Sequence, residues 1–372
     1  MNILLKYRTI SDNEKSNWND FISNSPNGDL LQSFEWGEVK RKDNWIPIKL
    51  VVEDESKIRG AILILKHKIP FVNLSIFYAP RGPVLDYEDH DAFDTLLDAI
   101  KNTAFIHKAI YIQIEPRAPI ENTRFSDYLK SKGFVNLKKK SIFRLGRARD
   151  IARVNIANSL DDILMSFHSK LRNSIRSAER KGIETIFGDS IDDLKIFYNL
   201  IEDTGFRQKF PVRNFGYFRE LWNNFLPSDI GKILLARYED QIIAGCFVFI
   251  FGQVCWYMYG ASSDLHRNLN APHLLHWKAI ELAKTRGCQY YDLAGCLRTP
   301  LSPDNPGYGI QKFKMRFNPE LYTFPEHYYI FRPSLYHLWV FGENLLGRLG
   351  NIYLKYHKPM KRVLGLFTSK SP

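Results

Sequence analysis

Positively charged side chains stand at three places where their charge could serve binding or catalysis. Lys40 ends a stretch with the spacing of an amphipathic helix. Arg213 and Tyr217 are four residues apart and are expected to share one face of a helix. Lys314 follows Phe313 within a run of closely spaced cations. From the residues alone, the alternatives are ordinary solvated cations and, around Lys314, a plain basic strand.

Motifs for other chemistries are missing from the sequence. It contains no HExxH, GxSxG or GxxxxGK[ST] motif, and no GxGxxG after a strand. His273 and His276 are three residues apart, but no carboxylate or cysteine stands at metal-ligand spacing beside them. They are therefore interpreted as surface or packing residues of a helix, and neither a metal nor a resident cofactor is expected.

The charge balance favours polyanionic partners. The 52 Lys and Arg residues exceed the 40 Asp and Glu residues by 12. A surface this basic suits nucleic acid, phosphates or an anionic membrane face, the alternative being a basic protein without such a partner. The four cysteines lack CxxC spacing and are interpreted as buried free thiols of a reducing compartment. No signal-peptide pattern or long apolar run is found, so a cytoplasmic location is expected.

Two parts of the chain repeat one order of elements. Residues 48–65 and 233–249 each read as a strand, an acidic turn and a second strand, with Gly60 and Gly245 at matching positions. A third strand, a helix and a buried strand follow in each part, at 75–78, 91–106 and 109–115 and again at 254–259, 272–286 and 288–293. A duplication explains this order most simply.

This order of elements is that of the N-acetyltransferase fold. We therefore predict an α+β protein with two tandem N-acetyltransferase-like domains, 1–150 and 151–333. Residues 334–372 form a basic, aromatic segment with helical spacing, which is interpreted as a helix packed on the core. The alternative is an interfacial helix that makes peripheral contact with the inner face of the membrane. The helical stretch 160–184 is too short for a coiled-coil arm.

The loops that should bind coenzyme A in such a fold are poorly suited to it. A pyrophosphate is held by backbone N–H groups, in a loop whose glycines let the backbone approach closely. In the second part the matching residues 264–272 include no glycine, and Pro272 has no N–H to donate. The matching residues 80–86 of the first part include two prolines. We infer that coenzyme A is not the donor.

Seven segments in one order resemble the Fem family of peptidoglycan bridge-forming aminoacyltransferases. They are 31–40 (LQSFEWGEVK), 78–84 (YAPRGPV), 112–116 (IQIEP), 257–262 (YMYGAS), 274–280 (LLHWKAI), 291–296 (YDLAGC) and 310–317 (IQKFKMRF). The resemblance covers residues 25–330 and implies two acetyltransferase-like domains. It also implies aminoacyl-tRNA as donor, and as acceptor the stem-peptide amine of a muramyl pentapeptide linked to UDP or to lipid, as in lipid II. Both substrates are heavily phosphorylated, which agrees with the net charge.

The resemblance assigns contacts with the acceptor to four residues. It implies that Lys40 contacts the acceptor diphosphate and that Arg213 and Tyr217 lie beside it, with Arg207 as the alternative to Arg213. It implies that Tyr259 lines the acceptor channel, the alternative being a core aromatic.

The resemblance also assigns roles near the reacting atoms. It implies that Phe313 and Lys314 are the family's Phe–Lys pair, with the Lys314 ammonium stabilising the oxyanion as the amine attacks the tRNA ester. Glu115 stands where the family commonly has Asp, and could orient the acceptor amine. Strand alternation predicts that Tyr257 and Tyr259 face the same side.

Other readings of the chain stay open at this point. The basic helix expected at 168–182 suits contact with the tRNA backbone, but is equally a solvated helix face. The rival functions are a coenzyme A-dependent N-acyltransferase on the same fold and a non-catalytic module that binds tRNA or the precursor.

Overall fold

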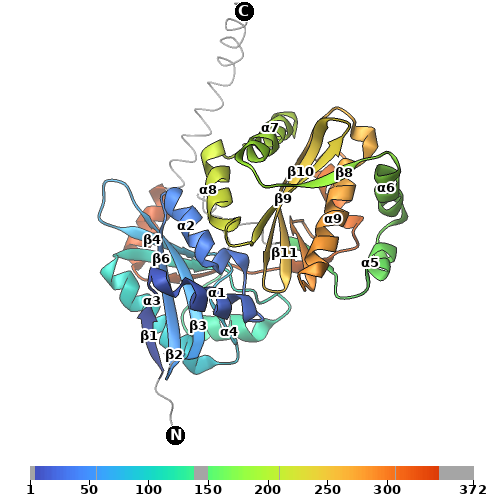
Figure 1. Cartoon of the computed structure of the whole chain (residues 1–372). Coiled ribbons are helices and arrows are strands. Elements are labelled where there is room, and N and C mark those ends of the chain that lie inside the picture. The colour runs from blue at the N-terminus through green and yellow to red at the C-terminus, as the bar shows by residue number, and fades with distance from the viewer. Residues whose placement is uncertain (1–4, 56, 138–149, 209, 306, 343–372) are drawn as a thin grey trace, which may run out of the picture.

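Each half of the chain builds one mixed β-sheet (Figure 1). The computed structural model describes residues 5–55, 57–137, 150–208, 210–305 and 307–342. The first sheet has the strand order β1-β2-β3-β4-β6-β14, with β5 paired to β3, and the second has the order β13-β7-β12-β11-β10-β9-β8. Each contains a parallel pair, β4 with β6 and β11 with β12, whose crossover includes α3 in one case and α9 in the other.

The elements of the first half are β1 Lys6–Thr9, η1 Asp12–Glu14, α1 Lys15–Asn24, η2 Leu30–Gln32, α2 Phe34–Lys42, β2 Ile46–Asp54, β3 Lys57–Lys68, β4 Ser75–Ala79, β5 Val84–Leu85, α3 His90–Ile106, β6 Ala109–Ile114 and α4 Thr123–Ser131. Those of the second half are β7 Asp150–Asn155, α5 Leu160–Ser166, α6 Ser169–Arg180, β8 Glu184–Gly188, α7 Ile191–Gln208, α8 Phe215–Phe225, β9 Gly231–Tyr238, β10 Gln241–Phe251, β11 Val254–Ser262, η3 Arg267–Leu269, α9 Ala271–Thr285, β12 Tyr290–Gly295, α10 Tyr308–Met315, β13 Glu320–Thr323 and β14 His327–Ile330. The α+β class and the repeated element order are confirmed. The stretch 160–184 contains two short helices rather than one arm.

The chain does not divide at a single point. The last strand, β14, pairs with β6 of the first sheet, although the predicted boundary placed residues 327–330 in the second domain. Strand β7 occupies the equivalent position beside β12 in the second sheet. We therefore call the first sheet with α1–α4 the first unit, which includes β14, and the second sheet with α5–α10 the second unit.

The predicted C-terminal segment is described only in part. Residues 333–342 are helical, and Leu335, Tyr336 and Trp339 pack against a small buried cluster that includes Ile110 and Tyr111. The remainder, 343–372, and residues 138–149, just before the predicted domain boundary, lie outside the described residues. Among the described helices, none combines the length and apolarity that crossing a bilayer requires.

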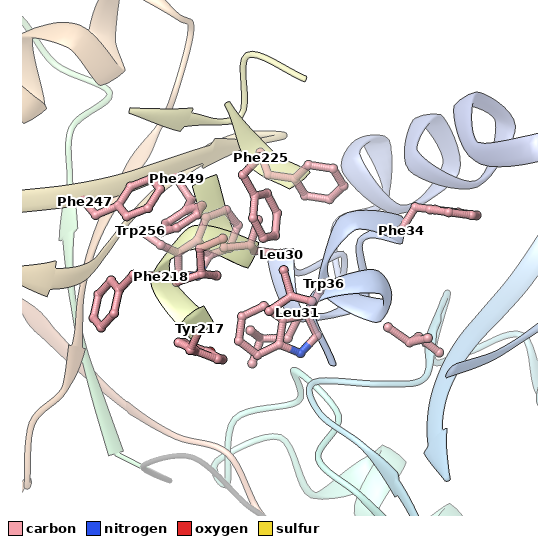
Figure 2. Packing of buried hydrophobic residues seen from close by; sticks show 14 of the residues in the cluster. Leu30, Leu31, Phe34, Trp36, Tyr217, Phe218, Phe225, Phe247, Phe249 and Trp256 are labelled. Atoms are coloured by element: carbon pink, nitrogen blue, oxygen red, sulfur yellow. The ribbon is translucent and has the colours of Figure 1, made fainter. Parts of the chain in front are cut away.

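One apolar cluster is shared by both units (Figure 2). It joins Phe34 and Trp36 of α2 to Phe218 and Phe225 of α8, and continues to Phe249 on the second sheet. The layers are therefore the first sheet, the pair α1 and α2, the pair α7 and α8, and the second sheet. Buried aromatic side chains contribute most of the apolar area in such a cluster, so the two units pack as one body.

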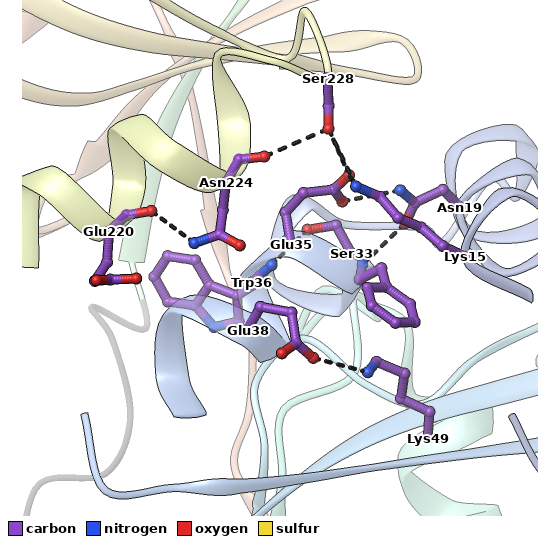
Figure 3. Close-up of polar contacts among 11 residues, drawn as sticks. Lys15, Asn19, Ser33, Glu35, Trp36, Glu38, Lys49, Glu220, Asn224 and Ser228 are labelled. Atoms are coloured by element: carbon purple, nitrogen blue, oxygen red, sulfur yellow. Dashed lines mark hydrogen bonds and ion pairs between the residues drawn. The ribbon is translucent and has the colours of Figure 1, made fainter. Parts of the chain in front are cut away.

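A buried carboxylate lies at the edge of this cluster (Figure 3). Glu35 on α2 is 1% exposed and its Oε1 lies 2.8 Å from the Nζ of Lys15. Asn19 on α1 donates to its Oε2 at 2.8 Å, and Ser228, after α8, donates to its Oε1 at 3.0 Å. Because a buried charge is costly unless it is paired and hydrogen-bonded, these contacts fix α2 against both α1 and the end of α8.

The two matched glycines of the repeat differ in their surroundings, which leads to a stability prediction. A Cβ at Gly245 would lie 2.7 Å from the buried ring of Phe197, whereas the nearest atom at Gly60 is 3.4 Å away. We expect Gly245→Ala to lower the free energy of unfolding by roughly 1–3 kcal/mol through overpacking, measured by urea denaturation. Gly60→Ala is the matched control and should cost less. Equal losses at both positions would contradict this explanation.

Candidate functional site

Lys40 lies where the two units meet. It is in the last turn of α2, a helix whose N-cap residue, Ser33, accepts a hydrogen bond from the backbone N–H of Trp36 at 3.2 Å. The Lys40 side chain is largely buried, and its Nζ lies 5.0 Å from the ring centroids of both Trp36 and Tyr217. The Oδ2 of Asp43 is 3.0 Å from the same Nζ. An aromatic face on α8 thus helps to hold a cation supplied by α2.

Arg213 joins Lys40 from the second unit. Its Nη1 lies 3.0 Å from Asp43 Oδ2, and its guanidinium carbon lies 4.9 Å from the ring centroid of Tyr217. The prediction that Arg213 and Tyr217 share a helix face was wrong, because Asn214 caps α8 and Arg213 precedes that cap. The chain turns so that the two side chains still meet. We call Lys40, Asp43, Arg213 and Tyr217 the α2–α8 cluster.

Arg207 does not share these contacts. It donates to the Ser262 carbonyl oxygen at 3.0 Å, and its Nε lies 3.6 Å from Asp264 Oδ1. Of the two arginines considered from the sequence, Arg213 is therefore the one whose contacts belong to the α2–α8 cluster.

Tyr259 connects this cluster to the interior. Its hydroxyl donates to the Tyr217 hydroxyl at 3.2 Å, and its ring packs against Phe218 at 5.0 Å between centroids. The prediction that Tyr257 faces the same side was wrong. A β-bulge places Met258 as an extra residue in β11, because Tyr257 pairs with Val248 and Tyr259 with Phe247. An extra residue reverses the alternation of side chains, so the two tyrosines point to opposite faces.

A cavity of about 340 Å³ lies between the units beside Tyr259. We call it the central cavity. Its charged lining comes from Asp29 and Arg81 of the first unit and Asp292 of the second. Trp256, Met258 and further residues complete it: Leu31, Ile151, Tyr259, Ala294 and Gly295. Both units are needed to form this cavity.

Lys314 lines a second cavity, of about 610 Å³, between β11, α9 and α10. We call it the α9–α10 cavity. The residues around Lys314 form the helix α10, so the alternative of a basic strand was wrong. The Lys314 Nζ donates to the carbonyl oxygen of Gly295 at 2.7 Å. Burial lowers the pKa of Lys314, while Cys296 and Asp292 act in the opposite direction. A cation that is held out of water in this way interacts strongly with any charge that develops beside it.

Phe313 forms part of the same wall. Its ring centroid lies 5.0 Å from that of His273 and 5.2 Å from that of His276. His276 is buried and shares a 2.9 Å hydrogen bond with the Tyr291 hydroxyl. Burial lowers the pKa of His273 to about 4 and that of His276 to about 3, so both imidazoles are neutral at physiological pH. The interpretation of His276 as a packing residue is confirmed by its burial among aromatic rings, and both histidines also line the cavity.

The two cavities share a wall at the bulge. Met258 lines both of them. Gly295 lines the central cavity, and its carbonyl oxygen accepts the hydrogen bond from Lys314, which lines the other. The α2–α8 cluster is connected to the same region through Tyr259. The structure thus links Lys40, through Tyr217 and Tyr259, to the central cavity, and the wall of that cavity in turn contacts Lys314.

Glu115 lies behind the wall of the central cavity. It follows β6 and is 2% exposed. The Tyr78 hydroxyl and the Gln113 amide each donate to its carboxyl group at 3.0 Å. Burial raises the pKa of Glu115 to about 7, and the nearby positive charge of Arg81 opposes that shift. The charge state of Glu115 therefore affects the electrostatics of the central cavity through Arg81, which lines it.

The sequence reasoning assigned no role to a buried ion pair beside the central cavity. Arg153 on β7 lies 3.0 Å from Asp292 on β12, and both side chains are almost fully buried. A charged residue within an otherwise apolar strand was the signal available, as in the run Tyr291-Asp292-Leu293. The pair fixes the direction of the Asp292 carboxylate, which also accepts from the backbone N–H of Ala294 at 2.7 Å.

The loop between β11 and α9 borders the α9–α10 cavity, and several of its backbone N–H groups are already engaged. The backbone N–H groups of Leu269 and Asn270 donate to carbonyls within the loop, and that of His273 donates to Asn270. Pro272, in the first turn of α9, has no N–H. None of these four positions can therefore donate a backbone N–H to an anion at this helix start.

Comparison with known proteins finds similarity over most of the chain. A family model described as the FemAB family matches residues 14–239, and an acetyltransferase (GNAT) domain model matches residues 165–314. The lipid II:glycine glycyltransferase of Staphylococcus epidermidis is 24% identical, over 92% of this chain and 96% of the relative. The enzyme of the same name from Staphylococcus aureus is 25% identical, over 92% and 97%.

A solved structure confirms the fold. The crystal structure of FemX superimposes with a TM-score of 0.83, covering 90% of this chain and 99% of that chain at 22% sequence identity. Together with the acetyltransferase domain match, this likeness confirms the predicted acetyltransferase-like architecture.

The raised pKa of Glu115 leads to a prediction about stability and pH. The folded protein binds this proton more tightly than the unfolded chain, so folding stability should fall as pH rises from about 4.5 to about 7. Glu115→Gln removes this dependence, because the amide does not titrate. Between pH 5 and pH 8 the wild type should lose roughly 2 kcal/mol more stability than the variant in urea unfolding. Parallel pH profiles for the two proteins would show that Glu115 is ionised in the folded state throughout this range.

Proposed function

The chain belongs to the FemAB family, and from that premise we propose that it transfers an aminoacyl group from aminoacyl-tRNA to the stem-peptide amine of a lipid-linked peptidoglycan precursor. One observation carries the proposal: two buried lysines from different units, Lys40 and Lys314, are each linked by direct contacts to residues that line the central cavity, Lys40 through Tyr217 to Tyr259 and Lys314 to Gly295. The acceptor follows from the relatives, which are named lipid II:glycine glycyltransferases. A nucleotide-linked muramyl pentapeptide carries the same diphosphate and would use the same cluster.

The α2–α8 cluster supports a diphosphate-binding role. Lys40 and Arg213 approach the same carboxylate, that of Asp43, each at 3.0 Å. Two cations held this close form a site for an anion with several charged oxygens, and a diphosphate is a stronger partner for them than one carboxylate. The ring of Tyr217 keeps both cations in place. The peptide of the acceptor would extend past Tyr259 into the central cavity.

The donor site is proposed to be the α9–α10 cavity. The loop at its edge has no glycine, and Pro272 has no N–H to donate, which disfavours coenzyme A and supports an aminoacyl ester of tRNA as the donor. Helix α6 packs on α9 nearby, with Leu171 and Ile175 buried and its basic side chains directed outward, which suits contact with the tRNA backbone. A thermal shift produced by acetyl-CoA, but not by charged tRNA, would favour the rival coenzyme A-dependent reaction.

The proposed chemistry needs positioning and charge stabilisation more than a strong base. The amine nitrogen attacks the ester carbonyl, a C–N bond forms, and the C–O bond to the tRNA ribose breaks. The proton lost by the amine passes to the departing ribose oxygen, so the substrates complete the proton transfer themselves. Holding the two reactants together can supply roughly 7–11 kcal/mol of the barrier. The Lys314 ammonium would stabilise the oxyanion, since its hydrogen bond to Gly295 holds it beside the wall of the central cavity.

Lys314 provides the first test of this mechanism. Lys314→Met should lower kcat by roughly 100-fold or more while the acceptor KM stays near its wild-type value, because the charge acts on the transition state. The assay is transfer of a radiolabelled amino acid from charged tRNA. Lys312→Met, an exposed lysine of the same helix, is the matched control and should keep wild-type kcat. A kcat for Lys314→Met equal to that of the control would remove Lys314 from the mechanism.

Lys40 provides the complementary test. Lys40→Ala should raise the acceptor KM by roughly ten-fold or more, because a charge-assisted contact to the diphosphate is lost. The KM for aminoacyl-tRNA should not change. Lys42→Ala, at an exposed position two residues later, is the matched control. Normal acceptor affinity in Lys40→Ala would count against a diphosphate site at the α2–α8 cluster.

A further inference from the structure

Three chain reversals meet at one end of the first sheet. Lys68 at the end of β3 pairs with Ser75 at the start of β4, and Ser75 lies beside Ala109 at the start of β6. Ile330 at the end of β14 pairs with Tyr111, also near the start of β6. The β3–β4 hairpin, the α3–β6 turn and the helix that follows β14 therefore project from the same end of the sheet. We call this surface the turn face, made of residues 66–75, 105–109 and 331–342.

Large apolar side chains are exposed to solvent on the turn face. Phe71 at the tip of the β3–β4 hairpin is 107% exposed, and Phe105 at the end of α3 is 78% exposed. Ile106 beside it, and Leu338 and Phe341 on the terminal helix, are also mostly exposed. Such a concentration of exposed apolar groups on a soluble protein marks an interaction site. The side chains protrude from separate turns rather than forming a groove. Such an arrangement suits insertion into a deformable surface such as a lipid bilayer.

The charges on the turn face have one sign. Its three segments contain Lys66, Lys68, Lys108 and Arg332, and no Asp or Glu. Lys66 Nζ lies 3.2 Å from the Nδ1 of His107, and burial together with Lys66 and Lys68 lowers the pKa of that histidine. Aromatic side chains interspersed with lysines and arginines are the pattern by which proteins bind an anionic lipid surface.

The turn face is continuous with the α2–α8 cluster. Ile46, which begins β2, pairs with Lys66, so α2 ends at the same end of the sheet. The Trp45 ring lies 5.0 Å from that of His67, and the backbone N–H of Trp45 donates to the carbonyl oxygen of Lys40 at 3.0 Å. Figure 1 shows the β3–β4 hairpin projecting beside α2. Trp45 alone therefore separates a molecule bound at Lys40 from the apolar, cationic turn face.

We propose that the turn face docks on an anionic lipid bilayer and so brings the lipid-linked acceptor to Lys40. This inference rests on the proposed function, because the diphosphate of that acceptor joins the peptide to a lipid chain that stays in the bilayer. Phe71, Phe105 and Phe341 enter the interface between headgroups and acyl chains, while Lys68 and Lys108 contact lipid phosphates. The protein would bind its acceptor without removing it from the membrane.

Vesicle binding tests the turn face directly. Cosedimentation of the full chain with vesicles of phosphatidylglycerol and phosphatidylcholine in equal parts should show binding that weakens with added salt and with phosphatidylcholine alone. Phe71→Ser with Phe105→Ser should raise the apparent dissociation constant by about ten-fold or more, because each ring contributes its own apolar area. Both side chains are exposed, so the thermal unfolding midpoint should not move. The charge variant Lys68→Glu with Lys108→Glu should weaken binding to the same surface.

A matched control comes from the second unit. Phe187→Ser with Phe206→Ser removes two phenylalanines that are 58% and 90% exposed but lie on β8 and α7. This variant should bind vesicles as the wild type does. The proposal is overturned if the wild type fails to bind the vesicles, if the Phe71 and Phe105 variant binds equally well, or if the control loses as much affinity.

The two proposals fail in different ways. Vesicle binding needs neither tRNA nor acceptor, so it can succeed when no aminoacyl group is transferred, and that result would reject the proposed function alone. With a nucleotide-linked acceptor in solution, the Phe71 and Phe105 variant should transfer at the wild-type rate. With lipid-linked acceptor in vesicles its rate should fall by about the loss in vesicle affinity. Equal rates for wild type and variant on the vesicle-bound acceptor would reject the docking surface alone.

Discussion

The packing of α2 against α8 is the constraint on which the rest of the site depends. These helices belong to different units, and their aromatic side chains form the cluster that both sheets share. The buried Glu35 adds direction to this non-directional packing, because its carboxylate must be satisfied by Lys15, Asn19 and Ser228 together. Breaking one of these contacts would leave a buried charge with too few partners. The position of Lys40 beside Tyr217 follows from that junction.

The second unit places its chemistry by a different device. The bulge at Met258 shifts the alternation of side chains along β11, so that Tyr257 packs in the cluster with α9 and Tyr259 in the cluster with α8. Tyr257 therefore packs near the α9–α10 cavity, while Tyr259 reaches the α2–α8 cluster. One extra residue in one strand thus connects the surroundings of both lysines. Bulges commonly occur next to active sites for this reason.

Local patterns predicted most of the elements but little of their pairing. The repeated strands and helices were evident because their periodicity depends on neighbouring residues, and Lys40 was correctly expected near a helix end. The cap at Asn214 moved Arg213 outside α8, although the spacing to Tyr217 suggested otherwise. The bulge and the return of 327–330 to the first sheet arise from contacts between strands far apart in sequence. Local sequence patterns do not specify which distant strands pair with each other.

The central claim is that the two substrates are held by different clusters of residues. The α2–α8 cluster with Lys40 holds the acceptor diphosphate, and the α9–α10 cavity with Lys314 holds the donor ester. A crystal structure with a nucleotide-linked muramyl pentapeptide and a stable amide analogue of aminoacyl-adenosine would test it most directly. The account predicts the diphosphate within hydrogen-bond distance of Lys40 Nζ and the aminoacyl carbonyl oxygen within hydrogen-bond distance of Lys314 Nζ. Density for the diphosphate on the loop at 264–272, or for the carbonyl outside the α9–α10 cavity, would contradict it.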